Sequence, residues 1–477
     1  MRTHRPSVLL FACTLALAGG LTLGGCAGAG SNDEPAAEAP AADAGSEHAG
    51  AGAGDTPVTE ASPAGAGLGV EIASPAEPGS GQPNLFAAAD GRVYMSWLEA
   101  AREEGAAPAS TRRGRFALRF ATLDGDAWSA PRTIAEGDDF FVNWADFPAI
   151  VESGGTLAAH WLRRNGGPGT SYDINIVRSR DGGASWSAPV VPHADGTRTE
   201  HGFVSLVAEP GGGFTAIWLD GREFASEEAR REMTLRAARF DGDGKQGPEA
   251  LLDPRICECC QTSAARVGDA LVAVYRDRSD TEVRDIWSVR RTNEGWQEPV
   301  RVSHDDWQIP GCPVNGPAIA GRGEAGAIVW FSLRQADPEV KLAFTRDAGA
   351  SFSPPILIDR ASAAAIDASS PREVAGLAAA SAAATPIPIG RVDVAWLDDS
   401  RVAITWVAAH GSGADILMQT VGVDGSLGKR HVVATTGSDR ASGFPQIVRS
   451  GERLVLAWTE TGETSVVRTM VIALPRL

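Results

Sequence analysis

Tyrosine is scarce in this sequence, which has three tyrosines against 13 tryptophans and 55 glycines in 477 residues. A long apolar run is also missing, because the stretch 9–23 is broken by glycines and is shorter than the roughly 20 residues that span a membrane as a helix. Lysine and arginine are not in excess either. The net charge of −17 argues against a nucleic-acid partner, since phosphate binding needs clustered cations.

The first 25 residues have the pattern of a bacterial export signal. Basic residues open the chain, and the apolar stretch ends in Leu-Gly-Gly before Cys26, which fits a lipobox. The pattern predicts a lipoprotein signal peptide over 1–25 and lipidation of Cys26. The alternative is an ordinary secretory signal with an incidental cysteine. Ala27 follows the cysteine, and this favours a lipid-anchored protein of the outer membrane, on its periplasmic side or at the surface.

The segment 26–66 follows the predicted lipidation site. It consists almost wholly of Ala, Gly, Pro, Glu, Asp, Ser and Thr, and it has no aromatic residue. Such a composition cannot bury enough apolar surface to offset the loss of chain entropy on folding. The sequence therefore predicts a disordered tether that holds the folded part off the membrane.

A unit of four short strands recurs through the rest of the chain. Each unit has a strand that ends in an aromatic residue, and these strands are expected at 93–97, 157–161, 214–218, 271–275, 327–330, 402–406 and 454–458. A repeat near fifty residues built of four strands is typical of a propeller blade, whose faces are buried only against its neighbours. The sequence predicts an all-β propeller of seven four-stranded blades over 67–477. The stretch 69–73 is expected to complete the last blade and close the ring.

Two turns in this region share one motif. Both fit the pattern Ser/Thr-x-Asp-x-Gly-x-x-aromatic, with key residues Ser179, Asp181, Gly183 and Trp186 in one and Thr345, Asp347, Gly349 and Phe352 in the other. We expect the Asp carboxylate to accept backbone N–H groups, the glycine to take a positive φ, and the aromatic ring to pack back on the hairpin.

The motif resembles the Asp-box of the sialidase family, also called the BNR repeat. As a whole, 67–477 resembles the sialidase-like lipoproteins of bacteria, which implies a propeller and a glycan substrate. Enzymatic sialidases have six blades, so a six-bladed ring is the alternative fold, with one unit false. The stretch 361–385 looks like an insertion.

Four cysteines remain after the signal and the lipid site, and all fall in loops that enter the first strands of neighbouring units. They are Cys257, Cys259, Cys260 and Cys312. Outside the cytoplasm two disulfides are the simpler interpretation. The alternative is a soft metal ion, copper or zinc, held by the four sulfurs, and no other cofactor is expected. His201, in the same set of loops, is a candidate additional ligand.

Arginines follow the second strands of four units. Arg163, Arg222, Arg276 and Arg334 could provide the cluster that, in sialidases, clamps a carboxylate bidentately. The alternative is that they form ion pairs between blades. Trp144, in a loop of the same face, is a further ligand-binding candidate.

A sialidase also needs a tyrosine nucleophile, a glutamate to activate it and an aspartate. Tyr275 is the one tyrosine expected near the centre, and with Arg276, Asp277 and Glu258 it forms the candidate catalytic group. Tyr275 replaces a strand-ending tryptophan, however, which suggests a packing role. The Phe/Tyr-Arg-Ile-Pro motif of many bacterial sialidases is absent.

The sequence thus predicts an anchored propeller that binds a glycan, a peptide or a metal on its Cys/Arg/Trp face. An exo-α-sialidase type of glycoside hydrolase is one alternative. A non-catalytic assembly platform, stapled by disulfides, is the other.

Overall fold

The structure is a computed structural model that describes residues 68–101, 114–226, 231–362, 386–411 and 413–477. The chain divides into two units, 1–62 and 63–477, and every described residue belongs to the second. The predicted signal, Cys26, the whole predicted tether and nearly all of the predicted insertion lie outside the described residues. No helix in the described ranges is long and apolar enough to cross a membrane.

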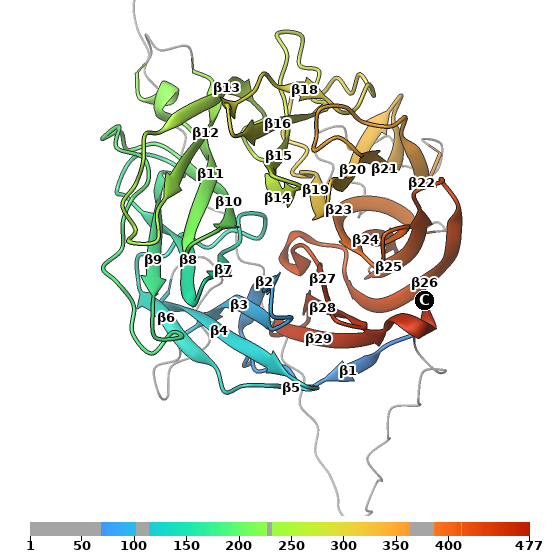
Figure 1. Cartoon of the computed structure of the whole chain (residues 1–477), viewed down its shortest axis with the longest axis horizontal. Coiled ribbons are helices and arrows are strands. Elements are labelled where there is room, and N and C mark those ends of the chain that lie inside the picture. The colour runs from blue at the N-terminus through green and yellow to red at the C-terminus, as the bar shows by residue number, and fades with distance from the viewer. Residues whose placement is uncertain (1–67, 102–113, 227–230, 363–385, 412) are drawn as a thin grey trace, which may run out of the picture. The chain divides into compact units, whose positions relative to one another are not determined.

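The second unit is an all-β propeller of seven blades arranged around a central channel (Figure 1). Blade 1 comprises β2 (Ser80–Ala87), β3 (Val93–Ala100), β4 (Phe116–Asp124), β5 (Ala127–Trp128) and β6 (Arg132–Gly137). Blade 2 comprises β7 (Ala149–Ser153), β8 (Thr156–Arg164) and β9 (Tyr172–Ser179). Blade 3 comprises β10 (His201–Glu209), β11 (Gly213–Asp220), β12 (Met233–Phe240) and β13 (Ala250–Ile256).

The remaining blades follow the same antiparallel order from the centre outward. Blade 4 comprises β14 (Ser263–Val267), β15 (Ala270–Arg276), β16 (Ile286–Thr292), β17 (Gly295–Trp296) and β18 (Val300–Arg301), and blade 5 comprises β19 (Ala318–Arg322), β20 (Ala325–Arg334), β21 (Asp337–Thr345) and β22 (Ile356–Arg360). Blade 6 comprises β23 (Ile387–Trp396), β24 (Arg401–His410), β25 (Gly413–Gly422) and β26 (Leu427–Gly437). Blade 7 comprises β27 (Gln446–Ser450), β28 (Arg453–Glu460) and β29 (Val466–Ala473) together with β1 (Val70–Ile72). Short 3₁₀ turns cover Arg222–Phe224, Arg440–Ser442 and Leu474–Arg476.

The ring closes as the sequence predicted. β1, from the start of the described chain, pairs antiparallel with β29 and so becomes the outermost strand of blade 7 (Figure 1). Blade 2 departs from the prediction, because it has three named strands and its outer strand is reduced to an isolated bridge between Ile176 and Val190.

The second strand of each blade lies in the core between the neighbouring blades. β11, for example, is buried along its whole length. The strand-ending aromatics of blades 4, 5 and 6 reach back to the preceding blade, where Tyr275 Oη donates to Asp253 Oδ2 (2.6 Å), Trp330 Nε1 to Asp305 Oδ2 (2.8 Å) and Trp406 Nε1 to Asp359 Oδ2 (2.8 Å). Each pair satisfies a buried donor while joining two blades.

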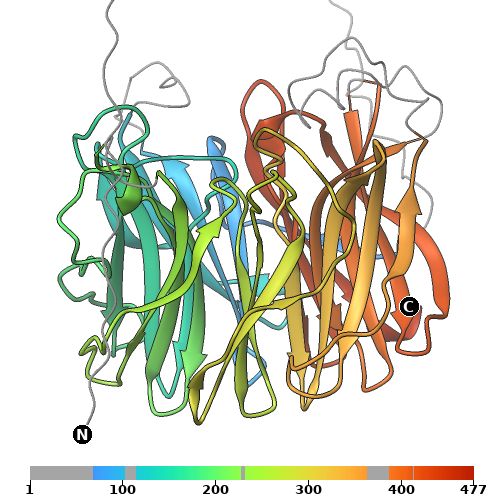
Figure 2. The ribbon, with the colours of Figure 1, turned by 90° about the horizontal axis from the view of Figure 1, so that it is seen from above.

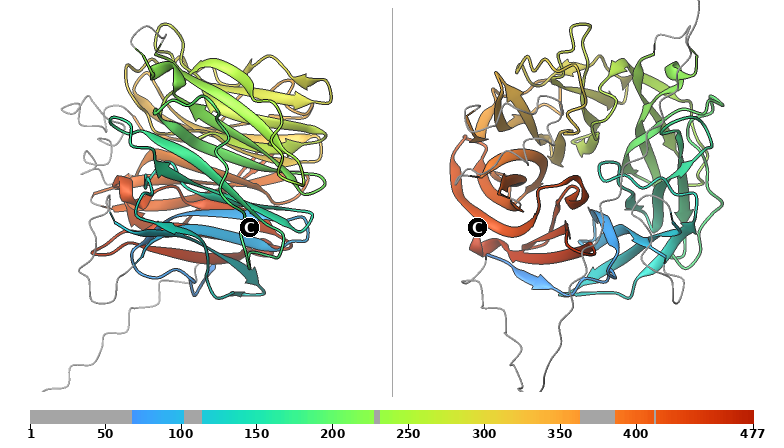
Figure 3. Two further views of the ribbon diagram at one scale, coloured as in Figure 1. Left: turned by 90° about the vertical axis from the view of Figure 1, so that its left-hand side faces the viewer. Right: turned by 180° about the vertical axis from the view of Figure 1, so that it is seen from behind.

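The first strands line a central cavity of about 660 Å³. Strands run between two loop faces, seen from the side in Figure 2 and in the left panel of Figure 3. We call the side on which the chain enters each first strand and leaves each second strand the entry face. At this end the cavity is bounded by Phe147, Phe444, Gln261 and Gly316.

The Asp-box turns lie on the opposite side and have the predicted local geometry. In the first, Asp181 Oδ1 accepts the Ser185 N–H (2.9 Å), and Gly183 has a φ of +89°. The aromatic ring differs from the prediction that it packs back on its own hairpin. Trp186 packs edge-on against Phe120 of the neighbouring blade 1, with ring centroids 5.8 Å apart. The second turn repeats this pattern, with Asp347 Oδ1 accepting the Ser351 N–H (2.9 Å).

We predict that Gly183→Ala destabilises the protein more than Gly182→Ala. Both glycines have positive φ, but a Cβ at Gly183 would lie 2.3 Å from the Phe120 ring, whereas a Cβ at Gly182 would meet nothing within 4 Å. The control variant therefore has only backbone strain, of about 1–2 kcal/mol, and Gly183→Ala adds about 1–3 kcal/mol of overpacking. Denaturant unfolding measures both. Equal losses would contradict this packing of the turn on blade 1.

Candidate functional site

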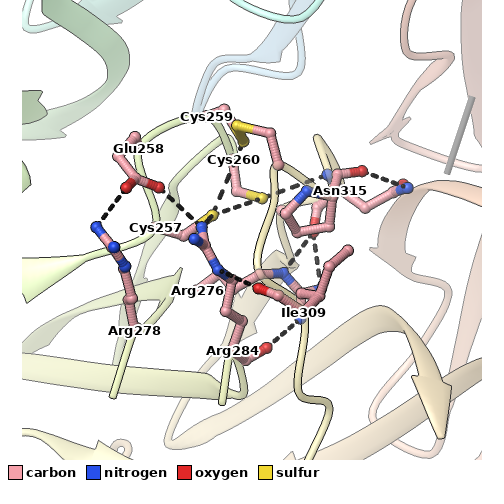
Figure 4. Close-up of a disulfide and its surroundings, with 12 residues drawn as sticks. Cys257, Glu258, Cys259, Cys260, Arg276, Arg278, Arg284, Ile309 and Asn315 are labelled. Atoms are coloured by element: carbon pink, nitrogen blue, oxygen red, sulfur yellow. Dashed lines mark hydrogen bonds and ion pairs between the residues drawn. A yellow bond between two sulfur atoms is a disulfide. The ribbon is translucent and has the colours of Figure 1, made fainter. Parts of the chain in front are cut away.

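The four cysteines come together on the entry face between blades 4 and 5. Cys259 and Cys312 form a disulfide that joins the loop entering blade 4 to the loop entering blade 5. Cys257 and Cys260 are free thiols, and their sulfurs lie 3.5 Å apart (Figure 4). One of the two bridges that the sequence suggested is therefore present, and the second pair stands close without a bond.

The two free thiols are buried, with exposures of 1% for Cys257 and 2% for Cys260. Arg284 Nη1 donates to Cys257 Sγ (3.1 Å), and the Asn315 N–H donates to Cys260 Sγ (3.4 Å). Burial raises the pKa of the Cys257 thiol, but the Cys260 hydrogen bond and the Arg284 charge outweigh it and lower the pKa to about 6. Burial, together with the neighbouring Cys257, raises the pKa of Cys260. These opposite directions favour a thiolate at Cys257 and a thiol at Cys260.

Ion pairs hold Arg284 in place. Its guanidinium contacts Glu258 Oε2 (2.8 Å) and Glu282 Oε2 (2.9 Å) as well as the sulfur, and Glu258 also pairs with Arg278 (Figure 4). The Arg284 side chain is only 4% exposed, so its charge acts on the sulfur with little screening by water.

Arg276 belongs to the scaffold of this site, which corrects its expected role in a carboxylate clamp. It is 2% exposed, and it donates to the backbone carbonyls of Asn315 (2.8 and 3.0 Å), Arg284 (2.6 Å) and Phe331 (2.7 Å). Its guanidinium also lies 4.8 Å from the centroid of the Trp307 ring. Four of its five N–H donors are thus committed to backbone carbonyls, and among the described residues Arg276 makes none of the expected ion pairs.

The other three arginines are not gathered into a clamp. Arg163 pairs with Asp139, and Arg222 pairs with Asp220 (2.7 Å), Asp195 (3.3 Å) and Glu249 (2.9 Å). These arginines therefore form ion pairs, but the pairs of Arg222 with Asp220 and Glu249 lie within blade 3 and not, as expected, between blades. Arg334 is exposed at the end of β20.

The candidate catalytic group is not assembled as one site. Neighbouring side chains on a strand point to opposite faces, so Tyr275 faces Asp253 of blade 3 while Arg276 faces blade 5. Tyr275 is 1% exposed, and burial raises its pKa well above the usual range. Burial, with the nearby Asp253, raises the pKa of Asp277 to about 7. Glu258 is committed to its two arginines.

Trp144 and His201 also have partners of their own. Trp144 stacks on Phe444, with the guanidinium of Arg391 over its ring at 5.2 Å. His201 is fully buried and stacks on His193 with centroids 3.7 Å apart, and its Nε2 lies 3.1 Å from Asp195 Oδ2. The sulfur cluster and the His201 cluster form separate groups of metal-ligating side chains, so the structure does not place His201 among the sulfurs.

A phenol shared between two carboxyl groups forms another cluster that the sequence did not reveal. Tyr172 Oη lies 2.9 Å from Glu200 Oε1 and 3.2 Å from Asp146 Oδ2. Because one hydroxyl hydrogen serves only one acceptor at a time, the phenol satisfies only one of these two carboxyl oxygens at a time. Glu200 also accepts a hydrogen bond from Thr170 Oγ1 on its Oε2 (3.3 Å). Burial raises the pKa of Asp146 to about 7, and it also raises the pKa of Glu200.

Comparison with known proteins assigns no family to the chain. No family model matches the chain, and no curated protein matches it. Similar solved structures include the α-L-arabinanase of Penicillium chrysogenum, at TM-score 0.43 and 14% identity over 85% of this chain and 99% of that one.

Two sialidases are similar to the same degree. The intramolecular trans-sialidase of Ruminococcus gnavus has a TM-score of 0.41 and 10% identity over 83% of this chain and 94% of that one. The endosialidase of phage phi92 has a TM-score of 0.44 and 9% identity over 85% and 69%. At these values the likeness says nothing about activity.

We predict that Asp146→Asn flattens the pH dependence of stability. The pKa of Asp146 in the folded state, about 7, lies above the ordinary aspartate value of 3.8, so its contribution to stability is fully present below about pH 4 and is lost as the pH rises through 7. The wild-type protein should lose up to about 1.4 kcal/mol per pH unit relative to the variant in this window. Urea unfolding at pH 4 to 8 tests this, and parallel curves would contradict it.

Tyr275→Phe should lower stability by about 1–3 kcal/mol, because Asp253 loses the donor that satisfies it in the core. Thermal unfolding gives the loss, and turnover of a fluorogenic sialoside is measured on the same samples. Unchanged stability combined with abolished turnover would instead support the catalytic role.

Proposed function

We propose that this protein is a lipid-anchored propeller of the cell envelope that exchanges electrons with thiols and disulfides through Cys257 and Cys260. The ligand of its entry face is then a thiol- or disulfide-containing peptide. The proposal is carried by one observation, the 3.5 Å separation of two buried sulfurs of which one accepts a hydrogen bond from a guanidinium.

Formation of a bond between these sulfurs requires little movement. A disulfide has an S–S distance near 2.05 Å, so the sulfurs would approach by about 1.5 Å. The spacing Cys257-x-x-Cys260 is that of many redox-active pairs, in which a stabilised thiolate attacks and the second thiol resolves the mixed disulfide. In each cycle the Cys257 thiolate and the Cys260 thiol give up two electrons and one proton. A second proton comes from solvent, and a substrate disulfide becomes two thiols.

The surroundings of Cys257 favour thiolate chemistry over a bound metal ion, which was the alternative to two disulfides. Arg284 bonds directly to its sulfur, and the charge of Arg276 acts on Cys260, so a cation placed between the sulfurs would meet two buried positive charges. The specific observation for a metal is that the sulfurs of Cys257, Cys259 and Cys260 lie within 4.8 Å of one another. Cys259 can serve as a thiolate ligand only after its bridge to Cys312 is reduced. Copper or zinc binding is therefore the second candidate function.

We expect the Cys257/Cys260 pair to titrate as a two-electron couple. The full chain is equilibrated in glutathione buffers of graded ratio and quenched with acid, and its thiols are alkylated and assigned by peptide mass. Both residues should lose their label together, with the ratio following the square of the reduced glutathione concentration. Metal is quantified on the same samples. Bound copper or zinc that blocks this oxidation would replace the redox proposal with the metal site.

Arg284→Met should raise the midpoint of thiolate formation above the value of about 6 expected for Cys257 in the wild type, because the cation that stabilises the thiolate is lost. The absorbance of the reduced protein near 240 nm, with Cys257→Ser as the blank, follows the thiolate without requiring access to it. Arg278→Met is the matched control, since Arg278 pairs with Glu258 and Glu282. Equal midpoints in both variants would contradict the role of Arg284.

A further inference from the structure

Solvent exposure divides the four sulfurs of the entry face into two pairs. Cys312 is exposed and Cys259 is partly exposed, whereas the side chains of Cys257 and Cys260 are buried. A partner molecule can therefore reach the disulfide but cannot reach the free thiols. If the buried pair exchanges electrons with other molecules, something must carry them across this boundary.

We infer that the Cys259–Cys312 disulfide is a shuttle between the buried Cys257/Cys260 pair and a disulfide or dithiol peptide in solution. The inference rests on the proposed function and assigns the residue that meets the partner. It is carried by the 3.9 Å distance between the sulfurs of Cys257 and Cys259, which places a nucleophile beside one end of the exposed bridge.

The exchange has two steps, and each conserves electrons. In the first, the Cys257 thiolate attacks Cys259 Sγ, the bond to Cys312 breaks, and Cys312 leaves as a thiolate that takes a proton from solvent. In the second, Cys260 gives up its proton and attacks Cys257, which forms the Cys257–Cys260 disulfide and releases Cys259. The exposed pair is then a dithiol and the buried pair a disulfide, with no outside oxidant or reductant consumed.

The exposed dithiol can next reduce a partner's disulfide, which re-forms the Cys259–Cys312 bridge. A dithiol donor restores the buried pair by the reverse steps. The buried pair thus stores two electrons, and the exposed pair delivers them.

The surrounding contacts fit the charge changes of these steps. Arg284 stabilises the attacking thiolate of Cys257, and the Asn315 N–H lies 3.4 Å from Cys260 Sγ, where negative charge develops in the second step. The same Asn315 is fixed by blade 6, since its Oδ1 accepts the Arg391 N–H (2.9 Å) and its Nδ2 donates to the Ile389 carbonyl (3.2 Å). The sulfur of Cys260, which attacks in the second step, therefore faces an N–H donor whose position is fixed by blade 6.

The test is native alkylation of the full chain with iodoacetamide, followed by disulfide mapping by peptide mass. The starting protein has Cys312 in its bridge, so Cys312 acquires label only after an internal thiol opens that bridge. In the wild type we expect label on Cys259 and Cys312 and a new Cys257–Cys260 disulfide. In Cys260→Ser we expect label on Cys312 with a trapped Cys257–Cys259 disulfide.

Cys257→Ser is the matched control, because it keeps the bridge and removes the attacking group. Labelling of Cys312 should be at least roughly tenfold slower in this variant. A tenfold dilution that leaves the wild-type rate unchanged shows that the exchange is intramolecular. If Cys257→Ser does not fold, Arg284→Met keeps all four cysteines and should shift the pH midpoint of Cys312 labelling upward.

Absence of label on Cys312 in the wild type, or equal labelling in Cys257→Ser, would overturn the shuttle. The glutathione titration separates this failure from failure of the proposed function. If the buried pair titrates while Cys312 stays unlabelled, the proposed function holds and the shuttle is ruled out. If the buried pair does not titrate at all, both the proposed function and the shuttle are ruled out.

Discussion

The constraint on which this structure depends is that a blade cannot bury its own faces. The second strand of each blade is apolar on both sides, so it is stable only between two neighbours, and a row of such blades is stable only as a closed ring. Closure by β1 removes the last open sheet edges. The aromatic-to-carboxylate contacts of blades 4, 5 and 6 fix how each blade sits on the one before it. The cysteine site uses this rigidity, since its sulfurs come from loops of adjacent blades.

Most of the fold could be predicted from the sequence, because the need to pack each blade between two neighbours produces the same residue pattern in every unit. The strand-ending aromatics gave seven units, and the strand at 69–73 matched the one that the last unit lacked. Asp181 and Gly183 made the turn predictable for local reasons, as its hydrogen bonds stay within a few residues. The outer strand of blade 2 was less predictable, because only a single bridge at Val190 defines it.

The candidate site was readable only in part. That four cysteines share one face followed from blade order, and the spacing Cys257-x-x-Cys260 was a signal present in the sequence that the interpretation overlooked. The role of Arg284 could not be predicted from any motif, because its contact with Cys257 exists only once the chain has folded. Arg276 looked like a ligand for anions, yet strand alternation turns it toward the carbonyls of blade 5. Sequence position indicates which face a residue occupies, and the partners on that face decide whether it is free to act.

The pairing of β1 with β29 also sets the order in which the protein can be completed. Val70 lies opposite Val471, so one of the first strands to emerge during synthesis or export waits for one of the last. Until then blade 7 is incomplete, and the strand edges at the two ends of the growing sheet array remain open to other chains. A chain that stops before β29 should therefore be a substrate for chaperones and proteases even though six blades are intact.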